Sequence, residues 1–141
     1  MKYTIKQVAE KFDLTEYAIR YYEKEGLLPN IARDEHGIRN FSEDDIEWIK
    51  LICCLRNTGM AISKIKNFVA LCIEGDGTLE LRREIILAQK KITEQKIKEM
   101  NNNLELINWK LNHYTGLIKE KKTESSCCNS INSCENSGAA V

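Results

Sequence analysis

Two short stretches near the start of the chain have the apolar spacing of amphipathic helices. In residues 4–12, apolar side chains recur every three or four positions, and Thr4 stands where an N-cap is expected. Thr15 opens a second stretch, residues 16–25, and Gly26 follows it as a typical helix stop. The pattern therefore predicts two short helices joined by a tight turn.

The pattern changes from helical to extended between residues 29 and 41. A turn-forming run, Asp34-Glu35-His36-Gly37, separates two short segments, which predicts a β-hairpin. The residue after the hairpin region, a serine, precedes a third helix whose first turn is acidic, as the helix dipole favours. We expect this helix to end just before Gly59, and a fourth helix to cover residues 62–73.

A long helix is expected from residue 79 to residue 122, because no proline interrupts this part of the chain. Its apolar residues alternate steps of four and three, which is the spacing of a coiled-coil seam. The seam consists of Met100, Leu104, Ile107, Leu111, Tyr114 and Ile118. A single helix cannot bury such a seam against itself, so we expect it to pair with a second copy of the chain.

Taken together, these segments predict a mainly α-helical protein in three parts. Residues 1–75 form a winged helix-turn-helix domain with the small β-hairpin as its wing, and residues 76–122 form a long C-terminal dimerisation helix. Residues 123–141 are rich in serine, asparagine and cysteine, and we expect this tail to be disordered.

Composition and charge restrict the classes of function that fit this sequence. The chain contains 21 lysine and arginine residues together and 21 aspartate and glutamate residues together. Positive and negative side chains are also equal in number within residues 1–70. A strongly basic footprint is therefore absent, and any case for DNA rests on the placement of particular cations. No apolar run reaches the roughly 18 residues of a membrane span, and the N-terminus does not resemble a signal peptide. We expect a cytoplasmic protein without a membrane partner, whose six cysteines are reduced.

An enzymatic function has no support in the sequence. It contains no phosphate-cradling glycine loop, no Cys–His pair in a plausible local motif and no paired carboxylates with a pocket around them. We therefore expect no catalytic residue and no cofactor.

The second predicted helix and the segments after it resemble the signature of the MerR family. Residues 15–29 contain R-Y-Y-E followed by G-L-L-P, residues 39–41 read R-N-F, and residues 55–60 read L-R-N-T-G-M. The resemblance covers about residues 1–75 and is specific, because three blocks occur in order with the right spacing. One departure is Ala61, which stands where the family usually opens the fourth helix with serine, so this helix is expected to be less well capped.

The resemblance implies a mechanism. Proteins of this family are homodimers, joined by an antiparallel coiled coil, that bind a palindromic operator in double-stranded promoter DNA. The activated dimer bends and untwists the DNA, which realigns widely spaced promoter elements for RNA polymerase. Bending a site of about 20–30 bp costs of order 1–6 kcal/mol, and a coupling of about 1–3 kcal/mol to an effector is enough to switch it.

The second predicted helix carries the main candidate DNA contacts on one face. Arginine reads guanine or clamps a phosphate, and tyrosine hydroxyls bind phosphate oxygens. The residues on this face are Tyr17, Arg20, Tyr21 and Lys24, which lie three or four positions apart. The MerR-like motifs add four further candidate DNA contacts, which are Thr15, Ala18, the wing residue Arg39 and, at the end of the third helix, Arg56. Helical geometry exposes only one of Tyr21 and Tyr22 well.

A narrower resemblance concerns Cys54. The run I-C-C-L-R-N-T-G at residues 52–59 is similar to the AdhR/NmlR branch, whose members carry a cysteine just before the L/M-R-N segment and respond to aldehydes and other electrophiles. Cys54 occupies that position. It lies on the polar side of its helix, one turn from Lys50, whereas Cys53 points inward. The charge of Lys50 favours a thiolate, while Glu47 and the nearby C-terminus of the helix oppose it. Cys54 is therefore the candidate effector-sensing residue.

Two other interpretations stay open. Cys127, Cys128 and Cys134 are candidate ligands of a soft metal ion, because metal-sensing relatives also carry cysteines after the dimerising helix. The start of the long helix, however, lacks the third cysteine that those relatives use. The other alternative, a coiled-coil adaptor without DNA binding, leaves the R-Y-Y-E and wing motifs unexplained.

Overall fold

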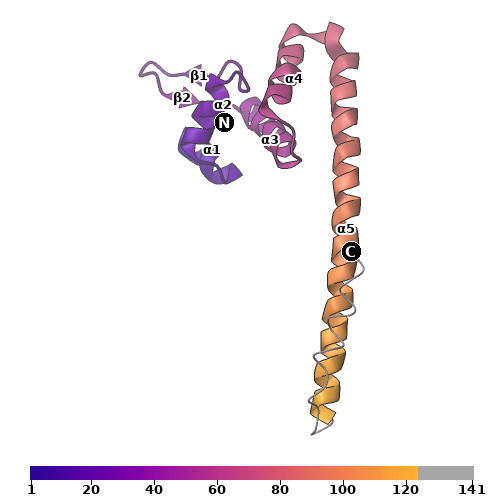
Figure 1. Ribbon diagram of the computed structural model, residues 1–141. Coiled ribbons are helices and arrows are strands. Elements are labelled where there is room, and N and C mark those ends of the chain that lie inside the picture. Colours follow the sequence, from indigo (N-terminus) through magenta and orange to yellow (C-terminus); the bar gives the residue numbers. More distant parts are fainter. Residues whose placement is uncertain (124–141) are drawn as a thin grey trace. The chain divides into compact units, whose positions relative to one another are not determined.

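The computed structural model describes residues 1–123, and these are mainly helical, as the sequence predicts. The metal ligands proposed at Cys127, Cys128 and Cys134, and the expected disorder of the tail from residue 124 on, lie outside the described residues. The elements occur in the expected order. They are α1 (Ile5–Phe12), α2 (Glu16–Lys24), β1 (Ala32–Arg33), β2 (Arg39–Asn40), α3 (Glu43–Asn57), α4 (Ile62–Glu74), the 3₁₀ turn η1 (Asp76–Thr78) and α5 (Leu79–Thr123) (Figure 1).

The starts of the helices follow the capping chemistry expected from the sequence. The Thr4 hydroxyl accepts a hydrogen bond from the backbone N–H of Gln7 at 3.2 Å, and the Ser42 hydroxyl accepts one from Asp45 at 3.1 Å. In both cases the acceptor side chain three residues on bonds back to the cap, which completes a capping box. Ala61 opens α4 without a side-chain hydrogen bond, which confirms the weaker cap inferred from the sequence.

The wing is a hairpin of two very short strands. Arg33 of β1 lies directly opposite Arg39 of β2. Gly37 makes the turn with φ of 77°, a left-handed conformation that glycine adopts without steric cost. Tyr3 forms a further bridge to Phe41, with backbone hydrogen bonds of 2.8 and 2.9 Å. These contacts attach the wing to the N-terminal segment and to the core, because Phe41 is fully buried.

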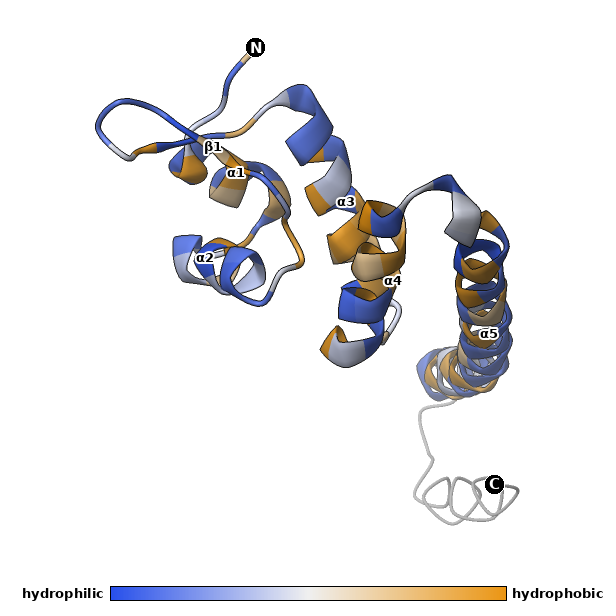
Figure 2. Ribbon diagram, turned by 90° about the horizontal axis from the view of Figure 1, so that it is seen from above, coloured by the Kyte–Doolittle hydropathy of each residue, from blue (hydrophilic) through white to orange (hydrophobic). Residues whose placement is uncertain are grey.

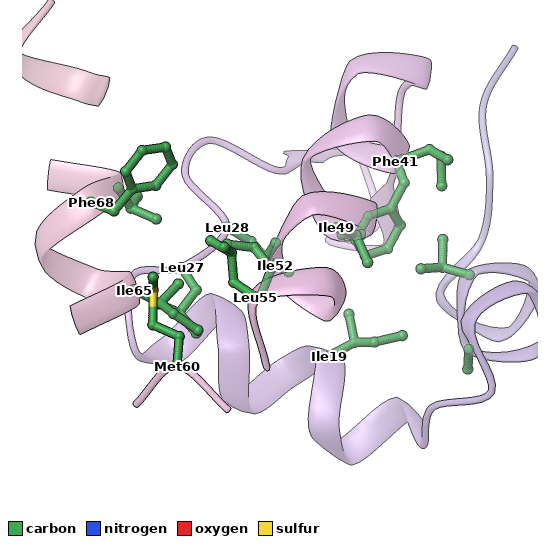
Figure 3. Close-up of a cluster of buried hydrophobic side chains, with 14 residues drawn as sticks. Ile19, Leu27, Leu28, Phe41, Ile49, Ile52, Leu55, Met60, Ile65 and Phe68 are labelled. Atoms are coloured by element: carbon green, nitrogen blue, oxygen red, sulfur yellow. The ribbon is translucent and has the colours of Figure 1, made fainter. Parts of the chain in front are cut away.

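One apolar core joins α1, α2, α3 and α4. Its fully buried side chains include Val8, Ile19, Leu27, Phe41, Ile49, Ile52, Ile65 and Val69 (Figure 3). Burying each such side chain favours folding by about 1.5–3 kcal/mol. Figure 2 shows the same arrangement by colour, with apolar residues gathered where α3 and α4 meet. This core fixes α2 relative to the helices behind it.

A hydrogen bond from α3 positions the segment that leaves α2. The indole N–H of Trp48 donates to the carbonyl oxygen of Leu27 at 2.7 Å. Gly26 ends α2 with φ of 78°, as expected for a helix stop. The end of α2 is thus held by the backbone turn and by α3 together.

The chain divides into two compact units, Met1–Thr93 and the part from Glu94 onward. Helix α5 is continuous through this division, so its first turns belong with the helix-turn-helix unit. The boundary predicted between residues 75 and 76 stays a prediction. No helix within residues 1–123 is long and apolar enough to cross a membrane.

The apolar seam of α5 is uncovered in the single chain. The exposed fractions of its residues are 68% for Met100, 52% for Leu104, 63% for Ile107, 61% for Leu111, 45% for Tyr114 and 57% for Ile118. Such an exposed apolar stripe is typical of an interaction surface. That a second copy covers it stays a prediction.

Candidate nucleic-acid interface

Helix α2, which we call the recognition helix, presents one face to the core and the opposite face to solvent. Ile19 faces the core and is 1% exposed, whereas Tyr17 is 77% exposed and the Arg20 side chain is 49% exposed. Tyr21 is exposed and Tyr22 packs against the core, which confirms that only one of the two tyrosines faces outward. The outward face therefore combines a guanidinium with two phenols, a set that suits base edges and phosphates.

The remaining candidate DNA contacts on the recognition helix differ in burial and in their partners within the helix. The Thr15 hydroxyl caps the helix by accepting the backbone N–H of Ala18 at 3.0 Å. Ala18 is half-buried, and Lys24 is exposed in the last turn. Arg20 Nη2 lies 3.0 Å from Glu16 Oε2, one turn earlier on the same helix. Such an exposed pair contributes little stability and leaves the guanidinium free to change partners.

The wing arginines share one carboxylate from the recognition helix. Glu23 accepts hydrogen bonds from Arg39 Nε and Nη2 at 3.1–3.2 Å and from Arg33 Nη2 at 3.0 Å. The Arg39 side chain is only 21% exposed, whereas that of Arg33 is 45% exposed. The structure thus gives Arg39 an intramolecular partner, and its contact with DNA stays a prediction.

Neither the pairing of Glu23 with the wing nor Arg33 as a candidate DNA contact was predicted from the sequence. The spacing of residues along α2 does not show which of them reach the hairpin, because that depends on how the hairpin folds back. The one signal in the sequence was the predicted hairpin, since its pairing places Arg33 and Arg39 opposite each other on the two short strands. Arg56, the last cationic candidate, is exposed near the end of α3.

Three cysteines lie in the described part of the chain, and they differ in exposure. Cys54 is exposed, whereas Cys53 and Cys72 are half-buried and pack against the core. Burial raises the pKa of the Cys53 thiol above its ordinary value. This confirms the inward orientation of Cys53 and the outward orientation of Cys54. Lys50, expected to favour a Cys54 thiolate, has its ammonium 3.9 Å from Glu47 Oε2. No group of three or more metal-binding side chains occurs within residues 1–123.

A chain of hydrogen bonds leads from Cys54 to α5. The carbonyl oxygen of Cys54 accepts the backbone N–H of Thr58, the C-cap of α3, at 3.0 Å. The Thr58 hydroxyl and carbonyl oxygens in turn accept hydrogen bonds from Gln89 Nε2 at 2.9 and 3.1 Å. Gln89 is 8% exposed and is the buried residue of α5. This contact could not be predicted from the sequence, because a lone glutamine on a long polar helix gives no sign of being buried.

Known proteins resemble this chain over most of its length. The MerR HTH family of regulatory proteins matches residues 3–71. An uncharacterized HTH-type transcriptional regulator of Haemophilus influenzae is 43% identical over 114 residues, which cover 81% of this chain and 84% of that protein. The HTH-type transcriptional regulator AdhR of Bacillus subtilis is 42% identical over 87 residues, or 62% of each chain.

A solved structure also matches closely. The crystal structure of HiNmlR, a MerR family regulator lacking the sensor domain and bound to promoter DNA, has a TM-score of 0.77 and 40% identity to this chain. The match covers 89% of this chain and 97% of HiNmlR. These similarities set aside the hypothesis of an adaptor without DNA binding. The chain belongs to the MerR family, in its AdhR/NmlR-like branch, and is a DNA-binding transcriptional regulator and not an enzyme.

Proposed function

We propose that this regulator binds a palindromic promoter operator as a homodimer and activates transcription when an aldehyde or another electrophile modifies Cys54. The exposed apolar seam of α5 supports the dimer, and the outward face of the recognition helix supports DNA reading by Arg20. HiNmlR, the structural relative, was crystallised on promoter DNA. In the proposed mechanism the modified dimer bends and untwists the promoter, so that RNA polymerase can engage it.

The observation that carries the sensing proposal is the place of Cys54 in the fold. Its thiol is exposed, and its carbonyl is bonded to the helix cap that Gln89 of α5 holds. A thiol adds to an aldehyde by forming a sulfur–carbon bond while the carbonyl π bond opens and the proton moves to oxygen. The thiolate is the nucleophile, and the Lys50 ammonium one turn away and the Glu47 carboxylate, 3.9 Å from that ammonium, are the nearest charges on the same face of α3.

The added group changes the end of α3, where two regions of the protein meet. An adduct on Cys54 enlarges a side chain one turn before Thr58, and Thr58 contacts α5 through Gln89. A displacement at this cap shifts the start of the dimerising helix and thereby the spacing of two recognition helices in a dimer. A shift of about 1–3 kcal/mol between two dimer geometries is sufficient for regulation.

The test is in vitro transcription from the protein's own upstream promoter, with and without an aldehyde. Cys54→Ser is expected to bind the operator like the wild type and to fail to activate. Cys53→Ser, the neighbouring cysteine, is the matched control and should keep activation. Mass spectrometry of the treated protein locates the adduct. Full induction of Cys54→Ser disproves thiol sensing at this residue.

The alkylation rates of the two neighbouring cysteines give an independent check. Burial raises the pKa of Cys53, so its thiolate fraction near neutral pH is lower than that of an ordinary thiol. We expect iodoacetamide to label Cys54 first at pH 7 and Cys53 to react appreciably only at higher pH. Lys50→Ala should slow labelling of Cys54 without abolishing it.

The metal-sensing alternative is tested by the same assay. Deleting residues 123–141 removes Cys127, Cys128 and Cys134 and, on the thiol-sensing proposal, leaves DNA binding and induction intact. Loss of induction in the truncated protein, together with zinc or copper bound to the intact one, favours metal sensing.

A further inference from the structure

Glu23, in the last turn of the recognition helix, brings two like charges together. Arg33 and Arg39 lie directly opposite each other in the hairpin, an arrangement that destabilises a strand pair. The Glu23 carboxylate accepts hydrogen bonds from both guanidinium groups, at distances of 3.0–3.2 Å. Glu23 therefore supplies the negative charge that this site needs.

The two arginines hold the carboxylate differently. Arg39 Nε reaches both carboxylate oxygens and its Nη2 reaches one of them, and the Arg39 side chain is 21% exposed. Arg33 reaches Glu23 through Nη2 alone, donates Nη1 to the carbonyl oxygen of Gly37 at 3.0 Å, and is 45% exposed. A bidentate, half-buried pair is the stronger one, so Arg33 is the arginine that can change partners.

We propose that the Glu23 carboxylate takes the place of a DNA phosphate in the free protein. On binding, Arg33 exchanges Glu23 for a backbone phosphate, while Arg39 keeps Glu23 and holds the wing to the recognition helix. A phosphate, like a carboxylate, offers a guanidinium two acceptor oxygens, whereas Arg33 reaches only one oxygen of Glu23. The inference requires DNA binding by this family member but is independent of thiol sensing at Cys54.

The exchange limits the affinity for DNA of any sequence. Each phosphate contact that Arg33 makes is offset by the loss of its pair with Glu23, so the wing contributes less than an unpaired arginine would. Phosphate contacts supply most of non-specific binding. The balanced charge of residues 1–70 fits a protein whose DNA-facing cations are matched by acidic residues. Glu23 thus sets how strongly the wing adds to sequence-independent affinity.

The test measures binding of the full-length protein to a non-specific duplex as a function of salt. Glu23→Gln is expected to tighten binding by about 2–5-fold, the factor that corresponds to losing one partly exposed ion pair. Arg33→Gln should weaken binding and lower the slope of log K against log salt by about 0.9, the value for one phosphate. In the double variant the gain from Glu23→Gln should fall to the gain that removal of any one negative charge gives, which Glu25→Gln measures, because Arg33 is no longer there to be released.

Glu25→Gln is the matched control. Glu25 lies two residues further on, and its carboxylate pairs with Lys66 of α4 at 3.1 Å and not with the wing. Any gain from Glu25→Gln reflects the change in net charge and should persist in the Arg33→Gln background. The proposal is overturned if Glu23→Gln binds no tighter than the wild type, if its gain without Arg33 exceeds that of Glu25→Gln, or if Arg33→Gln leaves the salt slope unchanged. Thermal unfolding of each variant verifies that the fold is retained.

Discussion

The two units of this chain differ in whether their apolar side chains are buried. In the unit Met1–Thr93, residues such as Phe41 and Ile49 are fully buried in a core that the single chain completes. Beyond Glu94, the large apolar residues of α5, such as Met100 and Ile107, are 68% and 63% exposed. The first unit therefore has the core of an independent domain, whereas the apolar residues of the second are left uncovered by the single chain. On the function proposed above, the first unit contacts DNA and the second determines assembly, and four experiments test that separation.

The largest effect is expected from charges in the seam. Leu104→Lys combined with Leu111→Lys places two ammonium groups in the proposed dimer contact, so the protein should be monomeric by light scattering. Two linked recognition helices gain from each other's binding, so operator affinity should fall by about 100-fold or more. Leu106→Lys is the control, since Leu106 is also exposed on α5 but lies outside the seam spacing. A double variant that is still dimeric would place the interface elsewhere.

The next prediction compares the loss of stability, measured by chemical denaturation, when one apolar residue of each unit is truncated. Phe41→Ala removes a fully buried ring and should lower the free energy of unfolding by about 3–5 kcal/mol at every protein concentration. Ile107→Ala should instead lower the part of the stability that rises with protein concentration, because its burial depends on association. If both losses of stability showed the same dependence on protein concentration, the two units would not differ in whether their apolar residues are buried by association.

An intermediate effect is expected where α3 meets α5. Gln89→Leu leaves the Thr58 carbonyl without the amide that bonds it, at a cost of about 1–3 kcal/mol. If α5 responds to Cys54 through this contact, the variant should still form the Cys54 adduct but activate transcription less. Gln95→Leu is the control, because Gln95 is exposed and its amide donates to Glu99 one turn away on the same helix. Normal activation by Gln89→Leu would show that the signal takes another route.

The smallest effect concerns the N-cap of α4. Ala61→Ser supplies the missing side-chain acceptor and should raise the free energy of unfolding by about 0.5–2 kcal/mol, measured by thermal or chemical denaturation. Ala70→Ser makes the same chemical change at an exposed position inside α4 and should cost roughly 0.5 kcal/mol. A variant at residue 61 that is no more stable than the wild type would mean that another group already satisfies the free N–H groups.

Local sequence determined the elements of this protein, because helix caps and apolar periodicity depend on residues within a few positions of one another. Thr4, Thr15 and Ser42 each begin a helix as expected, and the structure keeps α5 continuous from Leu79 to Thr123. The exposure of Cys54 and the outward direction of Arg20 also followed from helical geometry alone. The motifs then identified the family, since their spacing is specific.

Only the tertiary structure decided which side chains meet between elements. Glu23 and Arg39 are bonded across 16 positions of sequence, and Gln89 and Thr58 across 31. Neither pair has a periodic signal, because the contacts depend on how the wing folds onto α2 and on how α5 brings Gln89 to the C-cap of α3. The wing arginine that the sequence singled out is the one that the fold holds most firmly, and the more exposed Arg33 became visible only in three dimensions. Long-range polar contacts of this kind follow from packing, and packing is a property of the whole chain.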